Sequence, residues 1–586
     1  MFARDKRIGP YTYVYLVENV REEGRTKQRI IANLGRKEVV VARGDLDRLA
    51  RSVVRLAQRS MVLSLVEGEA PPNARCQRIG PALLFERLWH EVGCRAVLEE
   101  LAAGRRFEFA AERAVFLTVL HRLFVSGSDR AAEKWRADYR IEGTEALQLH
   151  HLYRAMAWLG EPLADQAGAS ELTPRCRKDL VEEGLFARRR DLFAELSVVF
   201  MDTTSLSFEG RGGEELGRRG HSKDYRPDLH QMIVGLVMDQ DGRPLCCELW
   251  PGNTADVTTL LPVVDRLRAR FSVGRICVVA DRGMISAQSI AALEERKLEY
   301  VLGVRERSSA EVRSTVIDDQ TPFVPLVVPR VSGELTELEA KQVKIGNRRY
   351  IVCRNLAEAR RDAEQRSAIL DGLRAKLAQG DKALVGNSGF RRYLKTVSAE
   401  HFAVDETRVA EDARFDGLYV LRTNTKLTPL QVMLRYRDLL RVEQLFRQAK
   451  AVLATRPIYH SSDMAIRGHV FCSFLALLLV KELEDRLHRH NIAAEWDDIL
   501  RDLDRLQEIE LEQDGKRFLL RTPTTGVAGK LFQAVGVALP PNLQETPPHY
   551  SAAGRLTRPR HCRRGAKTTA FVRKPLNLLD FLQSAV

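Results

Sequence analysis

The hydrophobic pattern changes its period near residue 196, and this change constrains the fold more than any other feature. From about 44 to 190, apolar residues recur at helical spacing, which predicts an all-α region. From 196 to 305, short apolar runs and amphipathic helical segments follow one another in the order βββαβαβ. Antiparallel strands followed by crossovers to parallel strands predict a mixed sheet with helices on its faces. The chain is therefore expected to be an α/β protein.

Other segments flank this sheet. Residues 10–36 alternate apolar and polar residues around Glu-Gly-Arg, which predicts a basic β-hairpin. The sheet pattern stops from 309 to 413, an interval too long and too structured for a loop, and resumes with a strand over 417–424. The predicted organisation is a basic β-hairpin and helical module (1–72), an all-α region (73–195), a sheet core in two parts (196–308 and 414–490) around a largely β insertion domain (309–413), and a C-terminal helical and basic tail (491–586) with a helix over 497–511.

Acidic residues stand at the ends of two predicted strands. Asp202 lies near the end of the first strand and Asp281 ends the fourth. These strands can be parallel neighbours, whose ends meet at one edge of a sheet, so we expect the two carboxylates side by side. Glu443, on the helix after the last core strand, can pack across the same edge. Each residue alone is more often a turn or cap residue, and Asp256 is interpreted as a helix N-cap.

Three buried carboxylates without basic partners repel one another, so such a cluster needs protons or cations. Mg²⁺ prefers carboxylate and phosphate oxygens, and two ions about 4 Å apart hold the attacking and leaving oxygens of an in-line displacement. The sequence therefore predicts that Asp202, Asp281 and Glu443 bind two Mg²⁺ ions, with Mn²⁺ as a substitute, and act on a phosphodiester.

The segment 436–450 is interpreted as one helix, in which Tyr436, Glu443 and Lys450 recur at intervals of seven and so share a face. Arg447 lies one turn after Glu443 on the same face. One interpretation is a solvated face with a Glu443 to Arg447 pair. The other is a DNA-binding face, on which Tyr436, Arg447 and Lys450 hold the phosphates that flank the acidic residues.

The net charge of +14 is distributed from the first residues to the last. A long polyanion suits this distribution better than a small acidic substrate, so double-stranded DNA is the expected partner. Lys223 and Arg226, in a glycine-rich loop, either contact that DNA or keep the loop soluble.

Several classes of protein are disfavoured. The apolar run 470–480 is too short to span a membrane and is interpreted as a buried helix. The first residues lack the apolar segment of a signal peptide, so we expect a cytoplasmic protein associated with the nucleoid. Cysteine and histidine residues lack the spacing of zinc ligands, and no phosphate-binding loop of a nucleotide-hydrolysing motor occurs.

Six short motifs carry a resemblance to a known family. They are "MDTT" with Asp202, "ADRGM" with Asp281, "Y-x2-L-x3-E-x6-K" with Tyr436, Glu443 and Lys450, "RPDLHQ" (226–231), "GNTAD" (252–256) and "RPIYH" (456–460). Together with the basic hairpin, they resemble the DDE transposases of bacterial insertion sequences. Within these, they are most similar to the insertion-sequence-four superfamily and its sixteen-thirty-four-like branch.

The resemblance implies a ribonuclease H-like core interrupted by a largely β insertion, two Mg²⁺ ions, and cut-and-paste movement of DNA bounded by inverted repeats. It also implies that the N-terminal region, including 73–195, binds the DNA ends and that a homodimer forms the synaptic complex. One rival is a nuclease of the same fold that cuts without strand transfer. The other is a sequence-specific DNA-binding protein whose acidic residues are structural.

The chain departs from the family pattern in two places. Leu439 stands where the family signature has arginine, and Arg447 is the candidate to compensate for it. Relatives that form a DNA hairpin stack a flipped base on a tryptophan of the insertion, but here the five tryptophans, at 89, 135, 158, 250 and 496, all lie outside 309–413. Whether a hairpin intermediate forms is left open.

Overall fold

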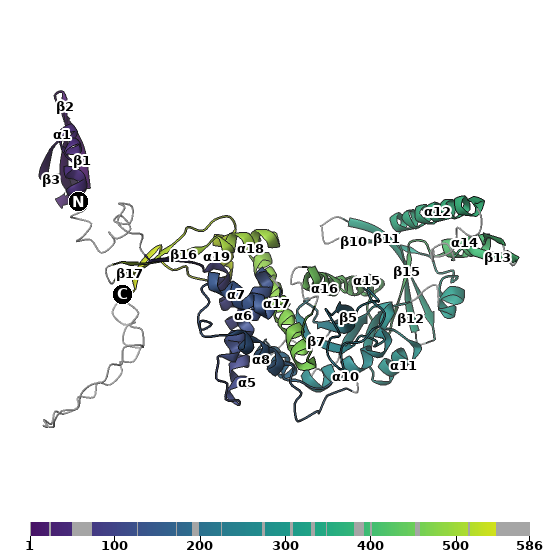
Figure 1. Ribbon diagram of the computed structural model, residues 1–586. Helices are drawn as coiled ribbons and strands as arrows, with labels where there is room; N and C mark the ends of the chain where they lie inside the picture. The colour runs from purple at the N-terminus through teal and green to yellow at the C-terminus, as the bar shows by residue number, and fades with distance from the viewer. Residues whose placement is uncertain are drawn as a thin grey trace, which may run out of the picture. The chain divides into compact units, whose positions relative to one another are not determined.

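A computed structural model describes residues 2–546 (Figure 1), with gaps at 23–24, 50–72, 126, 171–172, 190–197, 224–225, 272–275, 305–308, 330–334, 347, 380–391, 399–400, 452–457 and 514–515. The basic C-terminal stretch beyond 546 lies outside the described residues. The chain divides into two compact units, one of Met1–Ser64, Glu512–Phe518 and Glu545–Val586 and the other of Leu65–Leu511 and Leu519–Gln544.

The first unit begins with antiparallel strands in the order β1-β2-β3: β1 (Phe2–Ile8), β2 (Tyr11–Glu22) and β3 (Arg25–Arg36). The pairing of β2 with β3 confirms the predicted hairpin within 10–36. Sequence reasoning missed β1, because every residue of this strand is exposed and its sequence therefore carries no apolar alternation.

The second unit contains the predicted helical region. Its helices are α4 (Gly80–Val92), α5 (Cys94–Ala103), α6 (Ala111–Phe124), α7 (Asp129–Trp135), α8 (Leu149–Leu159) and α9 (Arg177–Arg189). Three of them, α4, α6 and α8, pack against the long helix α17 (Asp463–Arg489). Of the described helices, α17 alone is long and apolar enough to cross a membrane, but 89% of its apolar window is buried inside the protein. It is a core helix, as the run 470–480 predicted.

A large mixed sheet forms the rest of this unit, with its described strands in the order β10-β11-β12-β15-β9-β8-β5-β6-β7. Five of these strands are β5 (Val198–Ser207), β6 (Gln231–Met238), β7 (Pro244–Pro251), β8 (Cys277–Ala280) and β9 (Glu299–Gly303). β5 pairs antiparallel with β6 and parallel with β8, and β8 pairs parallel with β9. Helices α10 (Leu260–Phe271) and α11 (Ala287–Glu295) make the crossovers. The predicted order βββαβαβ and the parallel pairing of the two acid-bearing strands are both confirmed.

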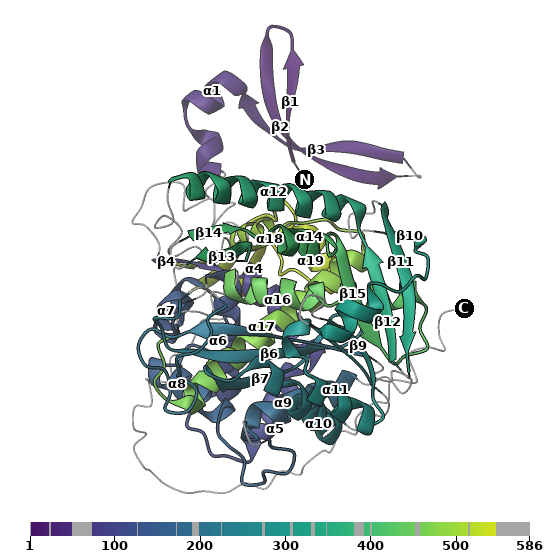
Figure 2. The same cartoon turned by 90° about the vertical axis from the view of Figure 1, so that its right-hand side faces the viewer.

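The first part of the segment predicted as an insertion adds strands to this sheet, and the second part lies outside the sheet. β10 (Val324–Pro329), β11 (Leu335–Ile345) and β12 (Arg348–Arg354) continue the sheet beyond β15 (Leu418–Thr423), which pairs antiparallel with β9. Between β12 and β15 lie α12 (Leu356–Gln379), β13 (Leu394–Ser398), β14 (His401–Val404) and α14 (Glu406–Ala413), which are grouped together in Figures 1 and 2. Leu370, Leu373 and Tyr393 form a small core of their own there.

Two predicted helices are wrong in extent. The segment 436–450 is divided between α15 (Pro429–Arg437) and α16 (Leu440–Ala451), because hydrogen bonds from Arg441 to Asp438 and from Val442 to Leu439 replace the i to i−4 pattern. The predicted helix 497–511 is helical only as α18 (Trp496–Asp504). Its second half is the strand β16 (Gln507–Gln513), in a sheet of order β18-β17-β16-β4 with β17 (Lys516–Arg521), β18 (Leu543–Thr546) and β4 (Asn73–Arg78). The sequence "EIELE" alternates as a strand does.

Candidate active site

The pairing of β5 with β8 ends partway along β5, which continues to Ser207 beside β6. The β5–β8 register stops at Met201 opposite Ala280. Just past this point the main-chain N–H of Thr203 donates to Asp202 Oδ1 over 2.7 Å, and the carbonyl of Thr203 accepts from Lys223 Nζ over 2.7 Å. The carboxylate of Asp202 is thus fixed to the strand by its own neighbour at the edge where the parallel strands end.

Asp202 lies in a region of negative potential. The pKa of its carboxyl group is raised to about 6, mainly by burial; Lys223 and the Thr203 N–H lower it, and the carboxylates of Asp281 and Glu443 raise it to a smaller extent. Both acidic partners that the sequence predicted are therefore close enough to act on Asp202. An ionised carboxylate there is unfavourable unless a cation accompanies it.

Asp281 follows β8 directly and is positioned by Tyr436. The Tyr436 hydroxyl donates to Asp281 Oδ1 over 2.8 Å. Burial and the Asp281 carboxylate raise the pKa of Tyr436, so the phenol stays protonated and remains a donor. The contact requires Gly303 at the end of β9, because a Cβ there would lie 2.4 Å from the Tyr436 hydroxyl.

Glu443 reaches the same edge on α16, which packs on β5 and β6. Val442, Leu445 and Phe446 bury the other face of the helix in the main core, which leaves Glu443 exposed. The prediction of three buried carboxylates is therefore wrong for Glu443. Leu439 is also buried, at the junction of α15 and α16, where it packs in the main core.

Sequence reasoning missed the role of Asp256. The N-cap of the short helix η3 (Asp256–Thr258) is Ala255, with no side-chain cap, so the predicted capping role of Asp256 is wrong. Its carboxylate instead accepts from the Thr203 hydroxyl over 2.9 Å and pairs with Lys223 Nζ over 3.0 Å. Lys223 Nζ also donates to Thr203 Oγ1 over 2.8 Å. The "GNTAD" motif, which ends at Asp256, was the signal available in the sequence.

The donor set suits a hard divalent cation, because it consists of carboxylate oxygens in a region that disfavours their ionisation. Across the described residues, however, no group of three His, Cys, Asp or Glu side chains is gathered closely enough to hold a metal ion. The predicted position of Asp202 at a strand end is wrong, because β5 continues to Ser207 beside β6. Asp202 nevertheless directly follows the last residue of β5 that pairs with β8, as Asp281 follows β8, and Glu443 is near enough to raise the pKa of Asp202. The ligand set itself stays a prediction.

The predicted DNA-binding residues differ in their surroundings. Arg447 is exposed on α16, and Arg226 forms a bidentate pair with Asp228 at 2.9 and 2.8 Å. The side chain of Lys450 lies outside the described residues. Tyr436 and Lys223 contact acidic residues of the protein, as described above. Their contacts with DNA stay predictions.

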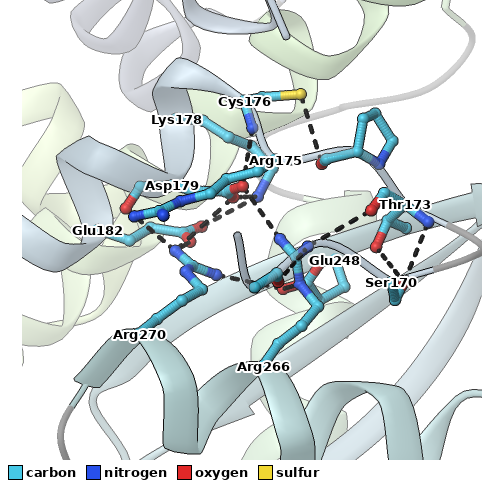
Figure 3. Close-up of polar contacts among 12 residues, drawn as sticks. Ser170, Thr173, Arg175, Cys176, Lys178, Asp179, Glu182, Glu248, Arg266 and Arg270 are labelled. Carbon is cyan, nitrogen blue, oxygen red and sulfur yellow. Dashed lines mark hydrogen bonds and ion pairs between the residues drawn. The ribbon is translucent and has the colours of Figure 1, made fainter. Parts of the chain in front are cut away.

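A second charged cluster, which we call the interior ion network, lies away from this edge between α9, α10 and β7 (Figure 3). It consists of the carboxylates Asp179, Glu182 and Glu248 and the cations Lys178, Arg266 and Arg270, all buried. Arg266 donates to Asp179 and to Glu248, each over 3.0 Å. In this network every carboxylate has a basic partner.

Two family models of transposases match the sequence. Residues 3–66 match the family model described as IS1634 family transposase, N-terminal domain, and residues 194–479 match the transposase DDE domain. No curated protein matched the chain. Among solved structures, a piggyBac transposase synaptic complex with hairpin DNA is similar, at 12% identity and a TM-score of 0.36, over 72% of this chain and 79% of that one.

A TM-score this low does not establish a shared fold, so the family assignment rests on the two sequence models. They cover more than half of the chain, and the second contains Asp202, Asp281 and Glu443. The chain therefore belongs to the DDE transposases of IS1634-like insertion sequences.

Proposed function

We propose that this transposase cleaves the ends of its element with a ribonuclease H-like core in which Asp202, Asp281 and Glu443 bind two Mg²⁺ ions. Support for the core comes from its strand order, in which β5 pairs antiparallel with β6 and parallel with β8. Support for the ligands comes from the pKa of Asp202, which is raised to about 6 mainly by burial, with smaller contributions from the carboxylates of Asp281 and Glu443. A bound divalent cation would favour the ionised form against both effects. The observation that carries the proposal is the position of Asp202 and Asp281, each directly after the last paired residues of the parallel strands β5 and β8.

Bound Mg²⁺ activates the attacking hydroxyl group and neutralises the charge that develops on the phosphodiester. The protein's part is to present ionised carboxylates in fixed positions. Asp202 is held by the N–H of Thr203, and Asp281 is held by the hydroxyl of Tyr436. Water first attacks the phosphorus at the element end, and the bond to the 3′ oxygen breaks to leave a 3′-OH. That hydroxyl then attacks a phosphorus atom of the target DNA, and the bond from this phosphorus to the target 3′ oxygen breaks to leave a new 3′-OH, so no covalent enzyme intermediate forms.

We further infer that the N-terminal region, up to about residue 195, recognises the terminal inverted repeats. Its first strands expose basic side chains such as Arg4, Lys6 and Arg7. Arg447, Lys450 and Arg226 bind phosphates near the cleavage site in this proposal. The partners are double-stranded DNA of the element ends and of the target, and a second copy of the chain in the synaptic complex. The proposed location is the cytoplasm, in association with the nucleoid.

The test is the variant Glu443→Gln, which keeps the size of the side chain but removes the charge that Mg²⁺ requires. We expect cleavage of labelled end DNA to fall by about a thousandfold or more, while end binding is retained. Arg441→Ala is the control, because Arg441 lies two residues before Glu443 and so points away from it. A Glu443→Gln protein that cuts end DNA at the normal rate would exclude the three-carboxylate assignment.

A strand-transfer assay with the same two proteins distinguishes a transposase reaction from simple nuclease activity. Labelled ends with a free 3′-OH are incubated with a supercoiled plasmid and Mg²⁺, and covalent joining is measured on a gel. We expect joined product with the wild-type protein and none with Glu443→Gln. Cleavage without joining would favour the nuclease reaction.

A further inference from the structure

Lys223, a cation of the glycine-rich loop that acts on Asp202, is already engaged by the protein. Lys223 Nζ lies within 3.0 Å of three oxygen atoms: the carbonyl of Thr203, the hydroxyl of Thr203 and the carboxylate of Asp256. An ammonium group has three donors, so these contacts use all of them. This arrangement does not suit a lysine whose task is to bind a DNA phosphate.

Two of the three oxygens belong to Thr203, and the third belongs to Asp256, whose other carboxylate oxygen accepts a hydrogen bond from the Thr203 hydroxyl; Thr203 is the neighbour of Asp202. Thr203 is the residue whose N–H holds Asp202 Oδ1, and it is also the residue that Lys223 and Asp256 hold from their side. Thr203 is buried and pairs with Gly235 of β6, but on the β8 side, past Met201, it has no strand partner. A shift of this peptide unit would therefore move the Asp202 carboxylate directly.

Asp256 also connects this contact to the second acidic residue. The position that a Cβ on Gly283 would take lies 4.0 Å from Asp256 Oδ2 and 3.9 Å from Asp281 Oδ2. Asp256 is thus close to the turn that carries Asp281, while its two oxygens are used by Thr203 and Lys223. A carboxylate in this place would repel Asp281 unless a cation such as Lys223 were bound to it.

We propose that Lys223 and Asp256 act as one ion pair that positions Asp202, through Thr203, for its role in catalysis, and that Lys223 is not a DNA contact. Neither residue touches the reacting atoms in this proposal. Both are positioning residues, and the inference rests on the proposed role of Asp202.

Four variants of the full-length protein test the pair: Lys223→Met, Asp256→Asn, the double variant, and Asp265→Asn as a matched control. Asp265, exposed on α10, forms a similar pair over 2.9 Å with Arg296, the half-buried residue that follows α11. We expect Lys223→Met to slow cleavage by about a hundredfold, because a displacement of about 1 Å in a catalytic group has an effect of that size. Asp265→Asn should cleave at the wild-type rate.

The double variant shows whether the two residues act as a unit. Lys223→Met alone leaves the Asp256 carboxylate unpaired beside Asp281, whereas Lys223→Met with Asp256→Asn removes both charges. We therefore expect the double variant to cleave no more slowly than Lys223→Met, and its rate should be higher if repulsion contributes. Multiplied effects of the two substitutions would show that they act independently and would overturn the proposal.

Two further measurements separate positioning from DNA binding and from loss of folding. The slope of the binding constant for end DNA against salt should be unchanged in Lys223→Met, whereas loss of a phosphate contact lowers it by about one. Fe²⁺-generated radical cleavage of the protein backbone near 202 and 281 reports metal binding without any turnover. We expect weaker or displaced cleavage in Lys223→Met and the wild-type pattern in Asp265→Asn. A reduced salt slope with an unchanged radical pattern would restore Lys223 as a DNA contact.

Substitutions of Thr203, which contacts both Lys223 and Asp256, complete the test. Thr203→Ser keeps the hydroxyl that links Asp256 with Lys223 and should cleave at close to the wild-type rate, and Thr203→Val should be slow. If Asp202→Asn cleaves normally, the proposed function fails. If Asp202→Asn is inactive while Lys223→Met is normal, only the positioning role fails.

Discussion

Asp179 and Asp202 are both largely buried carboxyl groups, yet their pKa values are displaced in opposite directions. At Asp179 burial favours the protonated form, but Lys178, Arg270 and Arg266 outweigh it and hold the pKa below its usual range. At Asp202 burial outweighs the opposing effect of Lys223, and the pKa is raised to about 6, with smaller contributions from Asp281 and Glu443. The difference lies in the partners. Asp179 is held ionised by the basic residues of the interior ion network, whereas the ionised form of Asp202 is disfavoured in the protein alone and would be stabilised by a bound cation.

The largest expected effect comes from breaking the interior ion network. Arg270→Met leaves Glu182 and Glu248 short of a partner in the interior, and removal of one member of a buried ion pair costs about 3 to 5 kcal/mol of stability. Thermal and denaturant unfolding should show this as a clear loss. The control is Arg296→Met, which breaks the pair with Asp265 at the surface, where the arginine is half-buried and the aspartate exposed, and should cost about 1 kcal/mol or less. Equal losses in the two variants would mean that the network is not a structural element.

A smaller effect, of opposite sign, is expected at the strand ends. The folded-state pKa of Asp202, about 6, lies above the unfolded value, so Asp202 stabilises the fold when protonated. This contribution, on the order of 2 kcal/mol, is complete below about pH 4 and is lost as the pH rises through about 6. In EDTA, the Tm of Asp202→Asn relative to wild type should therefore increase between pH 5 and pH 8. Mg²⁺ should stabilise the wild type at pH 8 and have little effect on the variant.

That comparison would fail if the Tm difference between Asp202→Asn and wild type did not change with pH. Asp202 would then be neutralised in the folded protein much as Asp179 is, and a bound cation would be unnecessary.

The smallest effect concerns the exposed cations of α16. We expect Arg447→Ala to weaken binding of end DNA by about tenfold or less and to lower the salt slope by about one, because Arg447 would contact phosphate. Arg441→Ala, on the opposite face of α16, should change neither. Binding is measured by titration at several salt concentrations. If Arg447→Ala leaves the salt slope of DNA binding unchanged, Arg447 does not contact phosphate. It would then be a basic partner of the acidic residues around Asp202, and these residues would differ less from the interior ion network.

The sequence was most informative where each element has one apolar period. The strands β5 to β9 are short apolar runs, so their order and the meeting of Asp202 with Asp281 followed from the sequence. The break between α15 and α16 could not be predicted. Leu439 continues the apolar pattern across the break, and the change to i to i−3 hydrogen bonds does not alter that pattern. The heptad spacing nevertheless placed Tyr436 at the right edge, where it contacts Asp281.

The ion pair of Lys223 with Asp256 could not have been predicted from the sequence. The two residues lie on different loops, and both loops contact Thr203. Thr203 lies in the part of β5 that extends past the end of β8. Each residue had an ordinary local interpretation, a soluble loop for Lys223 and a helix cap for Asp256. Only the three-dimensional arrangement of the loops decides against these interpretations.

The course of the chain between β12 and β15 determines where the molecule can change in length. The chain leaves the sheet at Arg354 and returns at Leu418, and these two residues face each other in the antiparallel register of β12 and β15. The N–H of Asn355 donates to the carbonyl of Gly417 over 2.9 Å, so departure and return are directly joined. Everything between them can be lengthened, shortened or replaced by a tight turn without breaking a hydrogen bond of the sheet. This is a natural site for grafting a foreign domain onto the transposase.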